Sequence, residues 1–305
     1  MKRNLFVGLA VTATIVAAAG CSTDNHGASP TTSVSATAMP TQSQSATEPS
    51  HPVTYSPQVE LPFGDNINHL AGVAVDTASN VYVLDLYYGQ VWKQAPGAVH
   101  LTQLPFTDPG RPVNVAVDTE GNLYIVDDFK SRVLKLAPGT GNPTVLPFTD
   151  IQPRDVAVDA AGNVYVTDSN TNRVWKLAAG ASNPIDLPLA DTQPGGVAVD
   201  AAGNVYVTDR HANRVLKLAT GASSPTALPF NDLNAPSDVA VNAAGDVFVT
   251  DFGADRVLKL TAGASSPTVL PFNGLKHPAA VAVDPTGNVY VLDDGHFRVL
   301  KLPIH

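Results

Sequence analysis

Residues 58–305 repeat one unit of about 41 residues six times, and this period constrains the fold more than any other feature. Each unit has four short runs rich in β-branched and aromatic residues, separated by Gly, Pro, Asn and Ser; in the fourth copy they are 197–199, 205–208, 215–218 and 226–230. The motif Val-Ala-Val-Asp marks the copies through Asp76, Asp118, Asp159, Asp200, Asn242 and Asp284. Four strands in about 40 residues are typical of a propeller blade. The sequence therefore predicts an all-β, six-bladed β-propeller with four-stranded antiparallel blades.

The Leu-Pro-Phe ending of the unit predicts how the ring closes. This run first occurs at residues 61–63, before any Val-Ala-Val-Asp motif, whereas the sixth copy stops at residues 302–305 without a fourth strand. We therefore expect residues 58–63 to form the outer strand of the last blade, next to strands from the C-terminus.

Three motifs in each unit resemble a known repeat. Gly-Val-Ala-Val-Asp, Gly-Asn-Val-Tyr-Val-Thr-Asp and Asn-Arg-Val-X-Lys-Leu, in this order, look like NHL repeats. With its Pro-Thr-X-Leu-Pro-Phe ending, the chain is similar to the extracellular sensor propeller of mycobacterial receptor Ser/Thr protein kinases. The resemblance covers residues 58–305 and implies a sensing or adhesion function. No kinase motif follows the repeats, so a signalling output would need a partner.

The N-terminal segment predicts a lipoprotein. Lys2 and Arg3 precede an apolar run over residues 5–19 that is too short for a stable membrane span, which is typical of a signal peptide. Cys21, the only cysteine, follows Ala-Ala-Gly as in a bacterial lipobox, although a plain signal peptide with an incidental Cys is the alternative. Residues 21–57 combine this residue with a Ser/Thr/Pro-rich segment that has few large apolar side chains and predicts a disordered tether. We therefore expect residues 1–20 to be removed and the protein to be lipid-anchored outside the cytoplasm, on the cell membrane of a bacterial envelope.

Charge narrows the classes of partner. Without Lys2 and Arg3, 16 basic residues face 27 acidic ones, which disfavours nucleic acid and anionic lipid surfaces. We therefore predict a monomer that touches the membrane only through its lipid, and whose ligand is an envelope glycan, a small molecule or a protein. No cofactor is predicted, because the chain has no Walker, Gly-X-Ser-X-Gly, His-Glu-X-X-His or EF-hand pattern.

The two faces of the predicted ring differ in sequence. The turns between first and second strands are uniform, as in Ala-Ala-Gly at 160–162, 201–203 and 243–245, whereas the loops between second and third strands vary. Binding residues usually lie in loops on a rigid scaffold, so we expect a ligand on the varied face. The predicted ligand-binding residues are Tyr87, Tyr88, Arg111, Asn114, Phe129, Arg154, Asp155, Arg210, His211, Asp238, His277, His296 and Phe297.

Recurrence separates structural from functional residues. An Asp ending the second strand and an Arg five residues later recur in five copies, and we interpret them as loop-bracing ion pairs; they are Asp127/Arg132, Asp168/Arg173, Asp209/Arg214, Asp251/Arg256 and Asp293/Arg298. A metal-dependent lyase or lactonase at the channel mouth is the alternative function. The heads of the inner strands carry no His, however, so we predict no metal and no catalytic residue. A purely structural scaffold is a third class.

Overall fold

The computed structural model describes residues 53–63, 67, 69–106 and 110–305, and residues 51–305 form one compact unit. The predicted signal peptide, Cys21 and most of the predicted tether lie outside the described residues. Within the described part, the helices are the single 3₁₀ turns η1 (Phe252–Ala254) and η2 (Asp294–His296). None of the helices in this part is long and apolar enough to cross a membrane.

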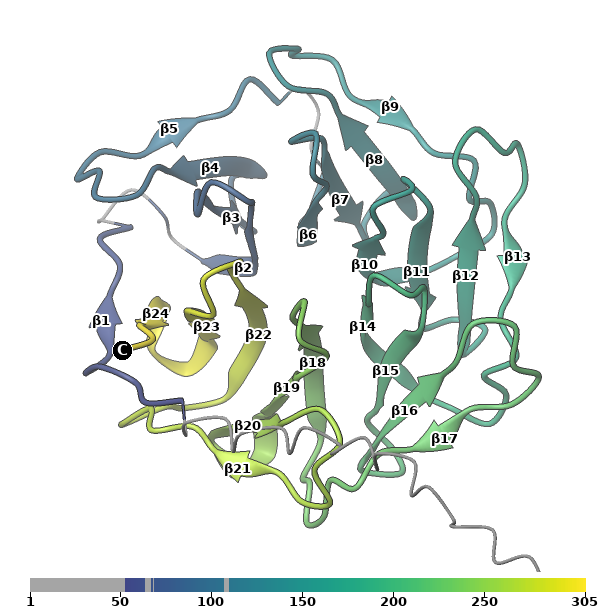
Figure 1. Ribbon diagram of the computed structural model, residues 1–305. Helices are drawn as coiled ribbons and strands as arrows, with labels where there is room; N and C mark the ends of the chain where they lie inside the picture. The colour runs from purple at the N-terminus through teal and green to yellow at the C-terminus, as the bar shows by residue number, and fades with distance from the viewer. Residues whose placement is uncertain (1–52, 64–66, 68, 107–109) are drawn as a thin grey trace, which may run out of the picture. The chain divides into compact units, whose positions relative to one another are not determined.

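Six four-stranded antiparallel sheets surround one axis, as Figure 1 shows. The innermost strand of each sheet contacts the innermost strands of both neighbouring sheets, and β2 contacts β6 as well as β22. The ring is therefore continuous around the axis. The prediction of a six-bladed all-β propeller is confirmed.

Each strand position recurs in every blade. The innermost strands are β2 (Leu70–Val75), β6 (Pro112–Val117), β10 (Pro153–Val158), β14 (Pro194–Val199), β18 (Pro236–Val241) and β22 (Pro278–Val283). The second strands are β3 (Val81–Asp85), β7 (Leu123–Asp127), β11 (Val164–Asp168), β15 (Val205–Asp209), β19 (Val247–Asp251) and β23 (Val289–Asp293). The third are β4 (Gln90–Gln94), β8 (Arg132–Leu136), β12 (Arg173–Leu177), β16 (Arg214–Leu218), β20 (Arg256–Leu260) and β24 (Arg298–Leu302). The outer strands are β5 (Thr102–Gln103), β9 (Thr144–Val145), β13 (Ile185–Asp186), β17 (Thr226–Ala227), β21 (Thr268–Val269) and β1 (Val59–Glu60).

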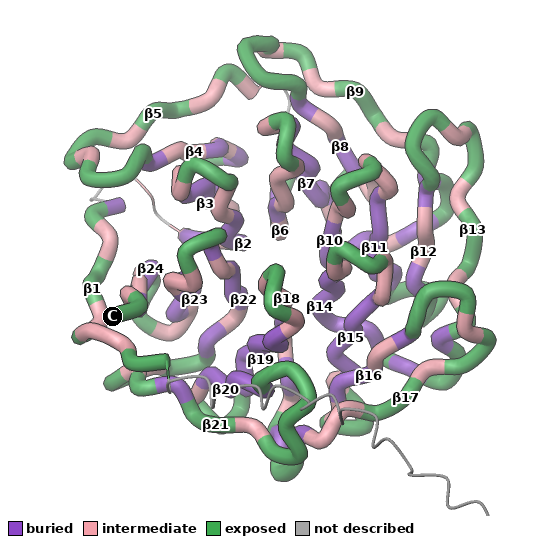
Figure 2. The backbone as a smooth tube through the Cα atoms, viewed as in Figure 1, coloured by how far each residue is buried: buried purple, intermediate pink, exposed green. Residues whose placement is uncertain are grey.

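The core lies between neighbouring blades. Figure 2 shows burial concentrated on the inner and middle strands, and every residue of the six second strands is buried. Tyr206 illustrates the repeated packing: its ring is 2% exposed, its hydroxyl donates to Asp200 at 2.9 Å, and Lys217 lies 5.2 Å above the ring centroid. The apolar, double-sided second strands follow from cover by a blade on each side.

Two strand boundaries of the fourth blade differ by three residues from the sequence-based expectation, and two others differ by one. In the fourth blade β14 begins at Pro194, three residues early, because Pro194 pairs with Asp209 before an irregular step in the register. Strand β17 ends at Ala227 rather than Phe230. Leu228 still donates to Val215 at 2.9 Å, but Pro229 has no N–H to continue the ladder, and the Phe230 N–H turns back to Leu228.

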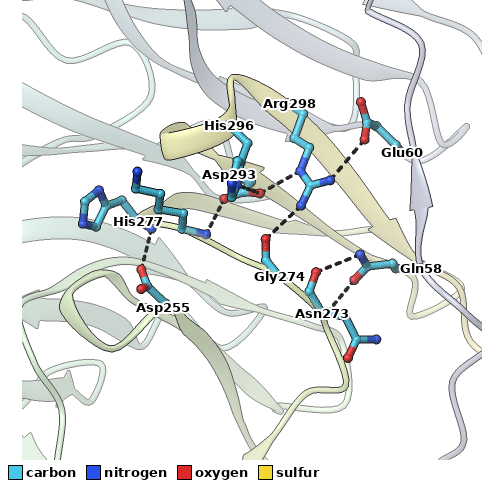
Figure 3. Close-up of polar contacts among 10 residues, drawn as sticks. Gln58, Glu60, Asp255, Asn273, Gly274, His277, Asp293, His296 and Arg298 are labelled. Carbon is cyan, nitrogen blue, oxygen red and sulfur yellow. Dashed lines mark hydrogen bonds and ion pairs between the residues drawn. The ribbon is translucent and has the colours of Figure 1, made fainter.

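Strand β1 forms the outer strand of the sheet that contains β22, β23 and β24. Val59 pairs with Lys301 and Glu60 with Leu300, and the Glu60 side chain accepts from Arg298 at 3.2 Å (Figure 3). Contacts with the C-terminus begin at Thr54, four residues before the predicted start at residue 58, through a bond from the His305 N–H at 2.8 Å.

Four of the five predicted bracing pairs form ion pairs. The Arg Nε lies 2.7–2.9 Å from the Asp carboxylate in Asp127/Arg132, Asp209/Arg214, Asp251/Arg256 and Asp293/Arg298. The third blade is the exception, and the prediction was wrong there. Arg173 pairs with Asp186 on the outer strand at 2.6 Å, and Oδ2 of Asp168, the oxygen that lies next to the arginine Nε in the other four pairs, accepts from the Thr171 hydroxyl instead.

Candidate ligand-binding site

Three rings of equivalent positions line the mouth of the axial channel. Each inner strand contributes its second and third residues, and the loop after each second strand contributes its first. The outer tier comprises Leu86, Asp128, Ser169, Arg210, Phe252 and Asp294. The middle tier comprises Ala71, Val113, Arg154, Gly195, Ser237 and Ala279. The inner tier comprises Gly72, Asn114, Asp155, Gly196, Asp238 and Ala280.

The three tiers surround a cavity of about 470 Å³. It opens on the face that carries the loops between second and third strands, because each inner strand begins beside the residue that ends the second strand, as Pro153 does beside Asp168. A concave site of this size with a few convergent polar groups is typical of a small-molecule pocket. The six blades supply the same backbone positions, but their side chains differ around the ring.

The inner tier contains two buried carboxylates that connect neighbouring blades. Asp155 on β10 accepts from the Val197 N–H on β14 at 2.6 Å and from the Asn114 amide on β6. Asp238 on β18 accepts from the Val281 N–H on β22 at 2.8 Å. Each carboxylate also accepts from the N–H of the residue that follows it, at 2.8 Å.

Burial dominates the electrostatics of these two carboxyls. Burial, and secondly the charge of Asp238, raise the pKa of Asp155 well above its usual range. Burial likewise raises the pKa of Asp238, to about 7, against the opposing effect of its two backbone hydrogen bonds. Burial therefore favours the protonated form of both carboxyls.

Two guanidinium groups lie above the inner tier, on adjacent blades. Arg154 is an exposed middle-tier residue on β10, and Arg210 is a half-buried outer-tier residue after β15. Burial, and then the neighbouring Arg154 charge, lower the pKa of Arg210. The Arg210 guanidinium carbon lies 5.9 Å from the Phe252 ring centroid.

Glycine at position 195 makes room for Arg210. A Cβ at Gly195 would lie 2.6 Å from the Thr208 hydroxyl and 3.1 Å from Arg210 Cγ. The arginine stem therefore packs directly on the inner strand, and its guanidinium is kept near the cavity. No other residue type fits this middle-tier position without a shift of its neighbours.

The outer-tier carboxylates have partners at the rim of the cavity. Asp128 accepts from Arg111 at 2.7 Å and 2.5 Å in a bidentate pair. Asp294 lies 3.9 Å from His69 Nε2. The pair with Arg111 offsets the negative charge of Asp128 at the rim.

Five of the thirteen predicted ligand-binding residues line the cavity: Asn114, Arg154, Asp155, Arg210 and Asp238. The aromatic predictions Tyr87, Tyr88, Phe129 and Phe297 are instead 55–75% exposed on loops outside it. Arg111 is held by Asp128, and His211 is exposed on its loop.

The two remaining histidines have neighbours of their own. Figure 3 shows His296 beside Asp293, with its Nδ1 3.0 Å from the carboxylate, and the His277 N–H bound to Asp255 at 2.7 Å. The His277 ring stacks on Phe252, with 4.8 Å between centroids. His277 therefore contacts Phe252, a residue that lines the cavity, but does not line the cavity itself.

Several lining residues were not among the predictions. They include Asp128, Ser169, Phe252 and Asp294 of the outer tier. All follow directly after the aspartate that ends a second strand, the position already chosen at Arg210. The repeat itself therefore contained the signal that identifies them.

Among the residues that the structure describes, no three His, Cys, Asp or Glu side chains lie close enough together to bind a metal ion. The carboxylates of Asp155 and Asp238 accept backbone N–H groups instead. These side chains do not fit a catalytic metal.

Comparisons with known proteins agree with the fold. The NHL repeat model matches residues 151–177 and 192–218, so the chain contains NHL repeats. No curated protein sequence matches the chain.

Solved structures with similar folds include several propellers. A catalytically inactive variant of virginiamycin B lyase from Staphylococcus aureus is 13% identical, with a TM-score of 0.64 over 82% of this chain and 99% of that one. A gluconolactonase from Xanthomonas campestris is 14% identical, with a TM-score of 0.66 over 81% and 89%. A chain of a nidogen/laminin complex is 20% identical, with a TM-score of 0.61 over 70% and 84%. At these identities the likeness shows the fold alone.

Proposed function

We propose, from the premise that the chain is a six-bladed propeller containing NHL repeats, that it is a lipid-anchored extracytoplasmic binding protein whose axial cavity holds a small ligand. One observation carries the proposal: side chains that the repeat does not require converge on one cavity of about 470 Å³. A scaffold without a ligand would need no such difference between blades. The predicted lipid anchor at Cys21 suits a sensor that samples the envelope.

Binding is favoured over catalysis by the state of the buried acids. Asp155 and Asp238 line the cavity, but both oxygens of each accept backbone or amide N–H groups. These hydrogen bonds hold each carboxyl between the inner strands of two neighbouring blades. The geometry therefore gives these carboxyls the task of joining blades.

A lyase or lactonase activity is the second candidate. The raised pKa of Asp238, about 7, is suited to a general base, and propellers of similar fold are named as lyases and gluconolactonases. If this candidate holds, Asp238→Asn will abolish turnover of a lactone by the purified propeller. Binding without turnover favours the first proposal.

Filling the cavity tests the binding function. Ala71 is a half-buried middle-tier residue, and Ala71→Trp adds a ring that occupies much of the cavity. Ala161, exposed in a turn on the opposite face, gives the matched control Ala161→Trp. The propeller is incubated with the low-mass fraction of an envelope extract, washed and analysed by mass spectrometry. We expect one or more compounds retained by the wild type and Ala161→Trp but lost from Ala71→Trp; equal retention by all three variants refutes a cavity ligand.

The anchor is tested separately. Cys21→Ser removes the only thiol, so we expect loss of acyl labelling and release of the protein from membranes. If the unlabelled variant is retained like the parent, the proposed lipid anchor is wrong.

A further inference from the structure

We infer that the ligand of the axial cavity carries a doubly negative oxyanion group, a phosphate or a paired carboxylate, which binds between Arg154 and Arg210. The inference rests on the proposed function and names the chemical class of its ligand. It follows from the distribution of ion pairs, the packing of Arg210 and the polarity around the cavity wall.

The two cavity arginines differ from the others in the described part of the chain. Six of the eight described arginines pair with a carboxylate; they are Arg111, Arg132, Arg173, Arg214, Arg256 and Arg298. Arg154 and Arg210 form no ion pair with any described residue, although this chain is rich in acidic groups. They are also the two that line the cavity.

Their mutual repulsion calls for a negative partner. Burial and the Arg154 charge both act against the protonated form of Arg210. A guanidinium binds phosphate or carboxylate oxygens through parallel N–H groups, and two guanidiniums offset two negative charges. An anion between them relieves the repulsion and satisfies donors that the protein leaves free.

The surrounding contacts fix where the anion lies. Arg210 is held by Phe252 at 5.9 Å and by the close packing on Gly195. Below it, the carboxylates of Asp155 and Asp238 occupy the inner tier and repel a second negative charge. The anion therefore binds at the outer and middle tiers, near blades three and four.

The opposite wall indicates the rest of the ligand. His69, Asp128 and Asp294 also line the cavity on the side of blades six, one and two, where the apolar side chains are those of Leu86, Ala71, Val113 and Ala279. These apolar side chains offer no hydrogen bond, so they suit a compact apolar portion. The ligand class is thus a small organic phosphate or dicarboxylate with an apolar body.

Titration with simple anions tests the inference. Isothermal titration is run with sulfate, inorganic phosphate, succinate and chloride on the wild type, Arg154→Gln, Arg210→Gln and the control Arg111→Gln. Arg111 lies on the same face but is neutralised by Asp128. We expect the dianions to bind the wild type at least tenfold more tightly than chloride, and each cavity variant to lose at least tenfold in affinity, about 1.4 kcal/mol. Arg111→Gln leaves the charge of Asp128 at the rim unpaired, so it should lose less affinity than either cavity variant.

The outcomes distinguish a phosphate from a dicarboxylate, and they distinguish failure of the oxyanion inference from failure of the proposed binding function. Phosphate and sulfate binding without succinate assigns a phosphate; succinate binding without phosphate assigns a dicarboxylate. Dianion affinities no better than chloride, or equal losses in Arg111→Gln, overturn the inference. If an envelope compound is still lost from Ala71→Trp but is retained by both cavity arginine variants, the cavity binds a ligand of another class, and only the oxyanion inference fails.

Discussion

Aspartate has opposite electrostatic roles in two regions of this propeller. In the turn between first and second strands, Asp200 accepts from the Ala202 and Asn204 N–H groups, the Asn204 amide and the Tyr206 hydroxyl, at 2.7–3.0 Å. Partial burial alone would raise the pKa of Asp200, but these hydrogen bonds outweigh it and lower the pKa. The pKa is lowered in the same way at Asp76, Asp159 and Asp284.

The axial aspartates Asp155 and Asp238 lie in the inner strands β10 and β18, four positions before the turn residue of the same blade. Asp155 and Asp159 are separated by four positions, yet burial raises the pKa of Asp155 whereas hydrogen bonds lower that of Asp159. The turn aspartate recurs in five of six blades, and the axial one in only two. Recurrence therefore marks groups that stabilise every blade, and its absence marks groups tied to one side of the cavity.

The largest expected effect concerns the pH dependence of stability. Because burial raises the pKa of Asp238 to about 7, the folded protein keeps a proton that the unfolded chain loses near its ordinary pKa. The contribution of this group therefore falls as pH rises from about 4 to about 7, by roughly 3–4 kcal/mol in the limit of an isolated group. Asp238→Asn removes the titration of Asp238 and leaves that of Asp155, so the slope of stability against pH should become smaller. Urea unfolding at pH 4.5, 6.0 and 7.5 measures the slopes; equal slopes in variant and wild type contradict the raised pKa.

A smaller loss of stability is expected from a turn aspartate. Asp200→Ala deletes four hydrogen bonds, and at about 1 kcal/mol each, reduced by solvent exposure, it should lower the free energy of unfolding by about 2–3 kcal/mol. The lowered pKa of Asp200 means that this stabilisation is present above the unfolded pKa and is lost as pH falls through the folded one. Urea unfolding at pH 7 gives the size. Sulfate affinity should not change, and a loss of affinity without a loss of stability would reverse the assignment of the two regions.

The inner tier should also make anion binding depend on pH. Ionised Asp155 and Asp238 oppose an anion above them, so sulfate, which stays a dianion throughout, should bind several-fold more tightly at pH 5.5 than at pH 8. The other charged or titratable groups lining the cavity are His69, Asp128, Arg154, Arg210 and Asp294. The dependence should persist in His69→Gln and diminish in Asp238→Asn. If the pH dependence of sulfate binding persists in Asp238→Asn but is lost in His69→Gln, it comes from His69 at the rim and not from the inner tier.

The fifth blade offers the smallest and most specific comparison. There Asn242 and Asp246 exchange the usual residue types, Phe248 replaces the tyrosine, and Lys259 pairs with Asp246 at 2.8 Å. The triple variant Asp200→Asn, Asn204→Asp, Tyr206→Phe copies this arrangement into the fourth blade, where Lys217 is equivalent to Lys259. We expect it to unfold within about 1 kcal/mol of the wild type. If the triple variant loses as much free energy of unfolding as Asp200→Ala, the arrangement is stable only among the other residues of the fifth blade.

The repeat made the blades predictable, but contacts between separate loops were hidden. The period and the apolar second strands were sufficient for six four-stranded sheets. Arg111 was chosen as a ligand residue because nothing in the sequence shows that Asp128, 17 positions away, binds its guanidinium. Arg173 likewise pairs across the blade with Asp186, 13 positions away, instead of with Asp168.

The cavity was predictable only where its residues stood out in a single copy. Arg154, Arg210, Asp155 and Asp238 are chemically unusual at their repeat positions, and all four line the cavity. The exposed tyrosines are unusual as well, but the loop after Leu86 directs them to solvent, and Tyr87 is 75% exposed. The position of a residue in the repeat does not show whether its side chain faces the cavity or solvent, because that depends on the backbone path of the loop.

The position of a bound oxyanion tests the central claim most directly. Crystals of the propeller soaked in selenate, a sulfate analogue with an anomalous scatterer, will show where a dianion binds. We predict an anomalous peak within hydrogen-bond distance of the guanidinium groups of both Arg154 and Arg210, and its loss in the double variant Arg154→Gln, Arg210→Gln. Peaks confined to other surfaces, with none in the axial cavity, would contradict the assignment of this cavity as an oxyanion site.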